Sequence, residues 1–183
     1  MTTPIRIGII SSSDRASRGE REDQSGQLLK RRLETWGGEV IAYRVLPDER
    51  GVLEWALCHL ADQLHCDLVL TTGGTGLGPR DVMPEATREI IQKEIPGIAE
   101  ALREAGRKKI KTAILSRGLA GLRDQTLIIN LPGSPEAVGE ALEILAPVLF
   151  HAVELIRGEV HDCQKVREEK WKGHFPPLSH SLP

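Results

Sequence analysis

The sequence predicts an α/β fold in which three layers (α/β/α) surround a mostly parallel, doubly wound sheet with one antiparallel strand. Strand and helix patterns alternate as β-α-β-α-β over residues 5–72, an order typical of parallel sheets with crossover helices. A loop with glycines at positions 73, 74, 76 and 78 follows the third strand. Two later apolar segments flank a tight turn, which indicates a hairpin and therefore the antiparallel strand.

Three strands and two helices are expected in the first part of the chain. Residues 5–11 form an apolar run that opens into polar residues, as a buried strand does. Residues 27–36 carry apolar side chains at the spacing of one helix face and end at a Gly-Gly pair, a common helix stop. A strand over 40–46, a helix over 52–64 and a strand over 67–72 complete this part.

Two helices are expected directly after the glycine loop. Pro84 stands where the first turn of a helix tolerates proline, and the helix continues over 85–93. Pro96 breaks this helix, and the next one spans 97–108.

The hairpin and a long helix complete the predicted domain. The hairpin joins residues 118–122 to 126–131, and the long helix spans 136–157. We expect one domain over residues 1–158 and a C-terminal tail over 159–183, where the regular patterns stop.

The composition excludes several classes of function. The 24 basic and 26 acidic residues give a formal net charge of −2, and aromatic residues make up 3% of the chain. The chain therefore lacks the basic surface and the stacking residues of a protein that binds nucleic acid. The most apolar late stretch, residues 141–156, is interrupted by Pro147 and by charged side chains, so no membrane span is expected.

Cysteine usage and the N-terminal residues predict a cytoplasmic protein. The first six residues lack the apolar core of a signal peptide, and the three cysteines form no CxxC pair. Two groups could be metal ligands, but the first lacks the usual spacing, and we interpret them as packing residues and as residues of the tail. The groups are Cys58, His59, His65 and Cys66, and in the tail His161, Cys163, His174 and His180.

Polar residues follow each predicted parallel strand. Ser13, Asp14 and Arg15 follow the first strand, Asp48 the second, residues 73–81 the third, and Gly133-Ser134 the last. Ligands of open α/β sheets bind beyond the carboxyl ends of the strands, so these loops should converge on one edge. Glycine-rich backbone before a helix suits an anion, because its N–H groups can approach closely.

The carboxylates in these loops point to a divalent cation. Mg²⁺ prefers one or two carboxylates together with waters and phosphate oxygens. Asp81 and Asp48 are the first candidates as ligands, with Asp14 behind them, and Arg80 adds a cation for phosphate. In the alternative interpretation Asp81 caps the following helix and Asp48 makes a turn. The loop matches neither GxxxxGK[ST] nor GxGxxG, which disfavours a kinase or a dinucleotide dehydrogenase.

At these residues the chain resembles the molybdopterin adenylyltransferases, the Mog/MoaB proteins, which are related to the G domain of gephyrin-like proteins. The resemblance covers about residues 5–158 and depends on several motifs in the same order. The motifs are Ser13-Asp14-Arg15, Asp23-Gln24-Ser25-Gly26, Leu46-Pro47-Asp48-Glu49, the loop 71–81, Pro84-Glu85-Ala86-Thr87, Leu115-Ser116-Arg117 and Asn130-Leu131-Pro132-Gly133-Ser134-Pro135.

The resemblance implies an enzyme that uses ATP and Mg²⁺ to adenylate molybdopterin. The terminal phosphate of molybdopterin attacks the α-phosphorus of ATP and releases pyrophosphate. That phosphate is already ionised near neutral pH, so positioning and charge neutralisation suffice for catalysis. A homotrimer and a partner protein for molybdenum insertion are also implied. The alternatives are a non-catalytic molybdopterin carrier or scaffold, and an enzyme acting on another phosphorylated heterocycle.

The resemblance also implies roles for individual residues. Asp48 and Asp81 match the essential acidic positions, which are catalytic and hold Mg²⁺. Arg80 and Arg15 either bind phosphates or form structural ion pairs. Met83 departs from the small polar residue of many relatives and alters the pocket rim. The remaining residues bind substrate. Its phosphate or pterin groups accept hydrogen bonds from Gly73, Gly74, Thr75 and Gly76. The rest of the pocket is lined by Ser13, Asp14, Ser116, Gly133 and Ser134.

Overall fold

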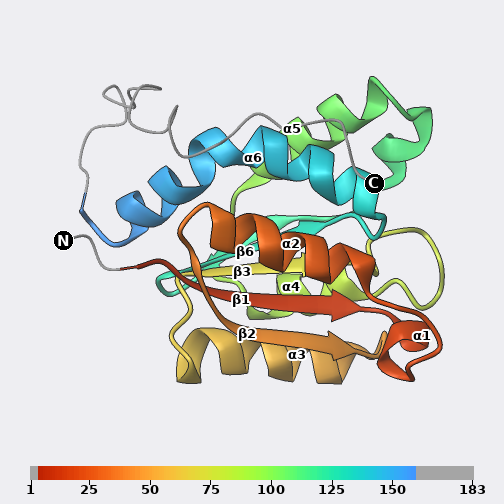
Figure 1. The fold of residues 1–183 in the computed structure, drawn as a ribbon, viewed down its shortest axis with the longest axis horizontal. Coiled ribbons are helices and arrows are strands. Elements are labelled where there is room, and N and C mark those ends of the chain that lie inside the picture. Colours follow the sequence, from red (N-terminus) through yellow and green to blue (C-terminus); the bar gives the residue numbers. More distant parts are fainter. Residues whose placement is uncertain (1–3, 160–183) are drawn as a thin grey trace.

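Six strands form one sheet in the order β2-β1-β3-β6-β5-β4. The computed structural model describes residues 4–159, and the sheet crosses the middle of the molecule between layers of helices (Figure 1). The strands are β1 Arg6–Ser12, β2 Glu39–Leu46, β3 Leu68–Thr72, β4 Lys93–Glu94, β5 Ala120–Arg123 and β6 Thr126–Leu131. The predicted tail, with its four potential zinc ligands, lies outside the described residues apart from Glu159.

The pairing of the strands confirms the predicted sheet. β1 runs parallel to β2 and β3, and β3 runs parallel to β6. β5 pairs antiparallel with both β6 and β4, so it is the one strand of the described sheet that runs in the opposite direction. The chain passes from β1 outward to β2 and then back to β3 on the other side of β1. The strand order therefore reverses between β1 and β3, where ligands of such sheets bind.

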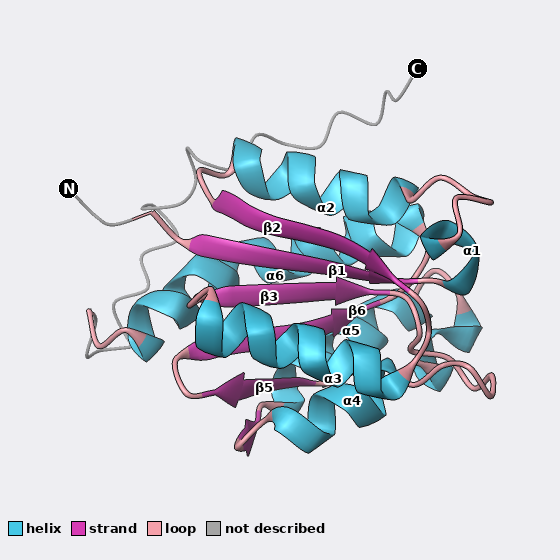
Figure 2. Ribbon diagram, turned by 90° about the horizontal axis from the view of Figure 1, so that it is seen from below, coloured by secondary structure: helices cyan, strands magenta, loops and turns pink. Residues whose placement is uncertain are grey.

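Helices cover both faces of the sheet. α2, α5 and α6 lie on one face, and α3 and α4 lie on the other (Figure 2). The helices are α1 Asp14–Ser17, α2 Gln24–Thr35, α3 Arg50–Cys58, α4 Met83–Ile90, α5 Pro96–Arg107 and α6 Pro135–Ile156. A π-helical segment, His59–Gln63, extends α3, and a 3₁₀ segment, Lys111–Leu115, follows α5. No helix within residues 4–159 is long and apolar enough to cross a membrane.

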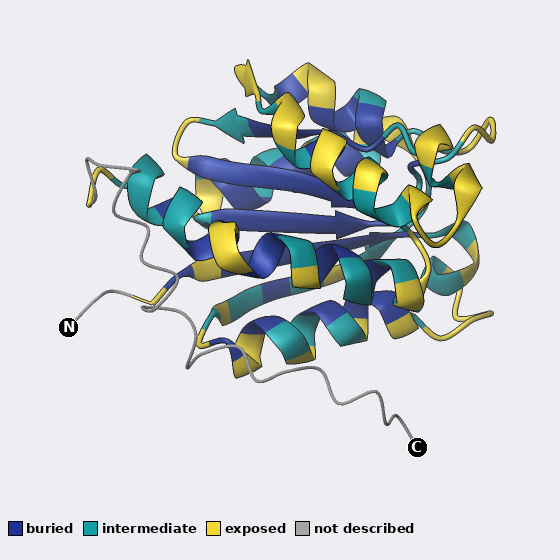
Figure 3. Cartoon of the chain, turned by 90° about the horizontal axis from the view of Figure 1, so that it is seen from above, coloured by how far each residue is buried: buried dark blue, intermediate teal, exposed yellow. Residues whose placement is uncertain are grey.

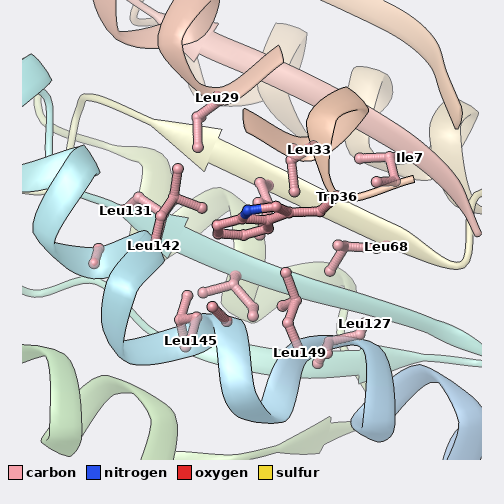
Figure 4. Close-up of a cluster of buried hydrophobic side chains, with 14 of the residues drawn as sticks. Ile7, Leu29, Leu33, Trp36, Leu68, Leu127, Leu131, Leu142, Leu145 and Leu149 are labelled. Carbon is pink, nitrogen blue, oxygen red and sulfur yellow. The ribbon is translucent and has the colours of Figure 1, made fainter. Parts of the chain in front are cut away.

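Alternating side chains of the central strands build two cores. Ile7 and Ile9 of β1 pack toward α2 and α6, whereas Ile10 packs toward α3 and α4. On the first side Trp36 meets Phe150 edge to face, with ring centroids 6.5 Å apart, and leucines of α2 and α6 surround it (Figure 4). The inner strands are buried on both faces (Figure 3), as expected for parallel strands between helices.

The structure differs from the predicted elements around β4. The predicted helix over 85–93 ends at Ile90, because the next residues pair with β5. Gly121 permits this close pairing, since a Cβ there would lie 2.7 Å from the carbonyl oxygen of Lys93. The partner strand is distant in sequence, so the local pattern carries no sign of it. Met83, expected at the pocket rim, is fully buried in the core beneath the glycine loop.

Candidate active site

The carboxyl ends of the parallel strands meet at one edge of the sheet (Figure 2). Two hollows open there, on either side of the glycine loop that follows β3. The first, here called the polar hollow, measures about 380 Å³. Its lining includes Ser13, Asp48, Gly73, Gly74, Asp81, Gly133 and Ser134 from the predicted set. These residues come from four different loops, so the predicted convergence is found in the structure.

Two glycines let the loop after β3 cross the end of β1. Gly73 has φ +90° and Gly74 has φ +64°, in the left-handed region that favours glycine. A Cβ on Gly73 would lie 2.3 Å from the carbonyl oxygen of Ser12. The loop therefore approaches β1 more closely than any other residue type would allow, and it forms one wall of the polar hollow.

Asp48 is held at the end of β2 by hydrogen bonds from the loop after β1. The hydroxyl of Ser12 donates to its Oδ1 at 2.5 Å, and the backbone N–H of Asp14 donates to its Oδ2 at 2.9 Å. Each carboxylate oxygen retains a further lone pair. Asp48 is therefore oriented within the hollow by both of its oxygens.

Asp14 and Arg80 form an ion pair beside the hollow. Arg80 donates from Nε and Nη2 to the Asp14 carboxylate at 3.0 and 2.9 Å. This side-chain hydrogen bond, with the backbone N–H of Asp48, lowers the pKa of Asp14 below its ordinary value. Neither residue lines the hollow, and Arg15 is exposed outside it. In this structure Arg80 thus forms an ion pair, one of the two roles expected for it.

Asp81 ends the glycine loop and faces the polar hollow. Its Oδ2 accepts a hydrogen bond from the N–H of Gly78 at 2.8 Å, and its Oδ1 accepts none from any residue within 4–159. The residue that begins α4 is Val82, and no side chain caps this helix. Asp81 therefore does not cap α4, which was the alternative role that the sequence allowed.

The donor set of the polar hollow suits a hard divalent cation that brings its own ligands. Among residues 4–159 no three His, Cys, Asp or Glu side chains cluster so as to hold a metal ion. Two carboxylates can therefore act as ligands: that of Asp81 through Oδ1, and that of Asp48 through the lone pairs that its hydrogen bonds leave unused. One or two carboxylates, completed by waters and phosphate oxygens, is the coordination that Mg²⁺ prefers. Cys66, one of the residues interpreted above as a packing position, is buried in the core.

Two helix N-termini also point to the polar hollow. Asp23 caps α2 by accepting from the N–H of Gly26 at 3.0 Å, and Ser134 caps α6 by accepting from the N–H of Ala137 at 3.2 Å. The hydroxyl of Ser25 donates to the carbonyl of Gly133 at 2.8 Å and joins the two helix starts. The positive ends of both helix dipoles favour an anion between them.

Two charged residues are among those that sequence reasoning did not assign to this hollow. Asp23 belongs to a motif of the resemblance but was given no role, yet the phenol of Tyr43 donates to its Oδ2 at 2.5 Å. Burial and this carboxylate raise the pKa of Tyr43. Arg21 lines the hollow and makes no ion pair within residues 4–159. Asp23 was recognisable as a helix cap, whereas no local pattern indicates Arg21.

The second hollow, here called the apolar hollow, lies on the other side of the loop and measures about 290 Å³. Thr75, Gly76 and Ser116 of the predicted set line it instead of the polar hollow. The remaining walls are mainly apolar and come from α5, the 3₁₀ segment and α6; they include Leu102, Ile110, Ala113, Leu115 and Ile144. The predicted site is thus divided by the glycine loop into a polar half and an apolar half.

This fold and site define a doubly wound α/β protein whose glycine loop lies beside a polar hollow at the reversal of strand order. Residues 8–151 match the family model described as "Probable molybdopterin binding domain". The chain belongs to this molybdopterin-binding family.

Relatives of known name agree with the family. The chain is 45% identical over 156 residues to the molybdopterin adenylyltransferase of Helicobacter pylori (strain J99), covering 84% of this chain and 89% of the relative. It is 43% identical over 145 residues to that of Escherichia coli (strain K12), covering 76% and 72%. The crystal structure of the molybdopterin biosynthesis enzyme MoaB from Thermus thermophilus superposes with a TM-score of 0.79 at 48% identity, covering 84% and 97%.

Proposed function

We propose that this chain is a molybdopterin adenylyltransferase of molybdenum cofactor biosynthesis. It transfers AMP from ATP to the terminal phosphate of molybdopterin and releases pyrophosphate. The observation that carries this proposal is the presence of Asp48 and Asp81 in one hollow with the positive-φ glycines of the loop. The family match and the names of the relatives support the same activity.

The residues of the polar hollow would neutralise and orient the phosphates. The backbone of Gly73 and Gly74, the helix starts at Asp23 and Ser134 and the guanidinium of Arg21 all favour an anion there. The attacking phosphate oxygen is ionised near neutral pH, so the site needs no strong general base. Its contribution is alignment of the two reactants and stabilisation of charge as it moves to the leaving pyrophosphate.

Asp48 and Asp81 would hold Mg²⁺ against the triphosphate. When bound, the cation neutralises charge on the phosphate oxygens and offsets their repulsion from the two carboxylates. Ser12 and the backbone of Asp14 hold Asp48 in place, and Gly78 holds Asp81. Asp14 itself would act through Asp48 rather than on substrate, since its carboxylate is engaged by Arg80.

Two hollows on either side of one loop suit a reaction with two large substrates. Backbone from Gly73 to Gly76 is shared between them, with Gly73 and Gly74 on the polar side and Thr75 and Gly76 on the apolar side. Ser116 and the apolar walls would hold a heterocycle by hydrogen bonding and apolar contact, in line with the scarcity of aromatic residues.

A molybdopterin carrier without turnover remains the second candidate. Such a protein would need the two hollows but no cation site, so the pairing of Asp48 with Asp81 in one hollow favours the enzyme. The test is AMP transfer from α-labelled ATP to molybdopterin, with and without Mg²⁺. Labelled molybdopterin adenylate and pyrophosphate are expected only with the cation. Pterin binding without adenylate formation would establish the carrier.

The remaining proposals concern assembly and location. We propose a homotrimer, as the family resemblance implies, and large apolar side chains exposed beside the apolar hollow would contribute to its interface; among them are Ile110, Ile114 and Leu115. Light scattering of the purified protein tests this.

We further propose a functional unit over residues 1–158 followed by the tail, a cytoplasmic location, and delivery of the adenylate to a molybdenum-insertion partner. The free thiols of Cys58 and Cys66 suit a reducing compartment, and burial raises the pKa of Cys66 to about 12.

A further inference from the structure

Arg117 lies at the base of the glycine loop, and every nitrogen of its guanidinium donates a hydrogen bond, two of them to the loop and one to α4. Nε donates to the carbonyl of Gly76 at 2.7 Å, Nη2 donates to the carbonyl of Asp81 at 2.5 Å, and Nη1 donates to the carboxylate of Glu85. The backbone N–H of Arg117 donates to the carbonyl of Thr75 at 2.9 Å. One residue thus holds both ends of the exposed loop tip over residues 77–80.

These contacts determine how Asp81 faces the polar hollow. Its main chain is tied to Arg117, and its side chain is tied to the N–H of Gly78 within the same tip. The N–H of Asp81 also returns to the carbonyl of Gly78 at 3.0 Å. If the tip moves, the carboxylate moves with it, because no other hydrogen bond within residues 4–159 holds that side chain.

Glu85, in the first turn of α4, holds the guanidinium in turn. Its Oε1 accepts from Arg117, whereas its Oε2 is buried and has no hydrogen-bond partner among the described residues. Burial raises the pKa of Glu85, but hydrogen bonds from Arg117 and from the backbone, with the charges of Arg117 and Arg88, outweigh that effect and leave it below its ordinary value. The first turn of α4 thereby holds the guanidinium against the two loop carbonyls.

We propose that Arg117, braced by Glu85, is a positioning residue that fixes Asp81 for adenylate transfer. This inference rests on the function proposed above. A planar guanidinium with three diverging donor groups can hold two carbonyls and a carboxylate at once, and a lysine ammonium cannot reproduce that fork. Arg117 also bonds to the carbonyls of Thr75 and Gly76, two loop residues that line the apolar hollow.

The test compares Arg117→Met and Arg117→Lys with a matched control, Arg123→Met. Arg123 of β5 also pairs with a carboxylate, that of Asp62, and donates to a carbonyl, that of Ile90, at 2.8 Å. It therefore braces the opposite end of α4 by the same kinds of bond, and it lines neither hollow. Comparable losses of thermal stability are expected in both methionine variants, whereas effects on the loop should be confined to Arg117.

Amide hydrogen exchange of the full chain reports the position of the loop directly. In both Arg117 variants the hydrogen-bonded amides of Gly78 and Asp81 should exchange about tenfold faster, as expected for loss of a charge-assisted hydrogen bond that holds the loop. In Arg123→Met they should exchange as in the wild type. Unchanged exchange of these two amides in Arg117→Met would overturn the proposal.

Adenylate formation then tests the consequence for the reaction. We expect kcat of Arg117→Met to fall, and the Mg²⁺ concentration for half-maximal rate to rise, by about 10- to 100-fold, as for loss of a group that orients a metal ligand. Arg117→Lys should recover little of either. Full rescue by lysine, or losses no larger than those of Arg123→Met, would overturn the proposal. A wild type that forms no adenylate contradicts the proposed function instead, and the exchange comparison still decides whether Arg117 positions Asp81.

Discussion

Asp14 and Asp48 bind one another through reciprocal hydrogen bonds between the loops that follow β1 and β2. The N–H of Asp14 donates to Oδ2 of Asp48 at 2.9 Å, and the N–H of Asp48 donates to Oδ1 of Asp14 at 3.1 Å. Two carboxylates can lie this close because each accepts from a backbone donor of the other residue, and because Arg80 neutralises Asp14. The proposed ligand Asp48 thereby acquires its orientation from a loop outside its own strand.

Replacement of Asp81 by asparagine should greatly reduce turnover and leave the fold intact. Asp81→Asn retains an acceptor for the N–H of Gly78 but removes the negative charge proposed to hold Mg²⁺. We expect a loss of about 10²- to 10³-fold in kcat, the scale of removing one electrostatic stabiliser, with little change in urea unfolding. AMP transfer from labelled ATP measures the effect, and equal rates in variant and wild type would refute the assignment.

Arg21 should contribute to binding a phosphate-bearing substrate. Arg21→Gln removes a cation that lines the polar hollow, and we expect KM for ATP or for molybdopterin to rise about tenfold with a smaller change in kcat. The control is Arg18→Gln, since Arg18 lies in the same loop, pairs with Glu20 and does not line the hollow. Steady-state kinetics with each substrate varied in turn make the comparison. Similar KM values for both variants would exclude this role.

A side chain at Gly73 should destabilise the domain. Gly73→Ala places a methyl group 2.3 Å from the carbonyl of Ser12 at φ +90°, and we expect a loss of roughly 2 kcal/mol in the free energy of unfolding. Gly51→Ala provides the control, because Gly51 lies in α3 with open space around it. That substitution should be neutral or stabilise by up to about 1 kcal/mol. Denaturant unfolding of both variants measures the difference.

The ion pair between Asp14 and Arg80 should stabilise the fold at neutral pH, and this stabilisation should be lost in acid. Arg80 lowers the pKa of Asp14 in the folded state below the ordinary value of 3.8. Its contribution is therefore complete above the unfolded pKa and is lost as the pH falls through the lower folded pKa. The difference in unfolding free energy between wild type and Arg80→Gln should be constant from neutral pH down to about pH 5 and shrink below about pH 4. A difference that grows on acidification would contradict this assignment.

Local patterns were sufficient for most of the fold. Strands β1 to β3 and β6 are apolar runs that end in polar residues, and α2 and α6 show helical spacing with clear end signals, so each was predictable alone. β4 was not, because its two residues become a strand only by pairing with Gly121 and Leu122 of β5. This strand forms only against a backbone partner that is distant in the chain, so the local residue pattern does not indicate it.

The sequence by itself determined which loops converge, because alternation of strands and helices places the polar ends of the parallel strands at one edge of the sheet. It left open whether Asp81 caps a helix and whether Arg80 meets phosphate or a carboxylate. Only the tertiary structure decided these points: Asp81 bonds to Gly78 and faces the hollow, and Arg80 bonds to Asp14. It also divided the site into a polar and an apolar half and placed Arg117 beneath the loop. Hydrogen-bond partners and hollows depend on distances between loops far apart in the chain, and residue spacing does not contain those distances.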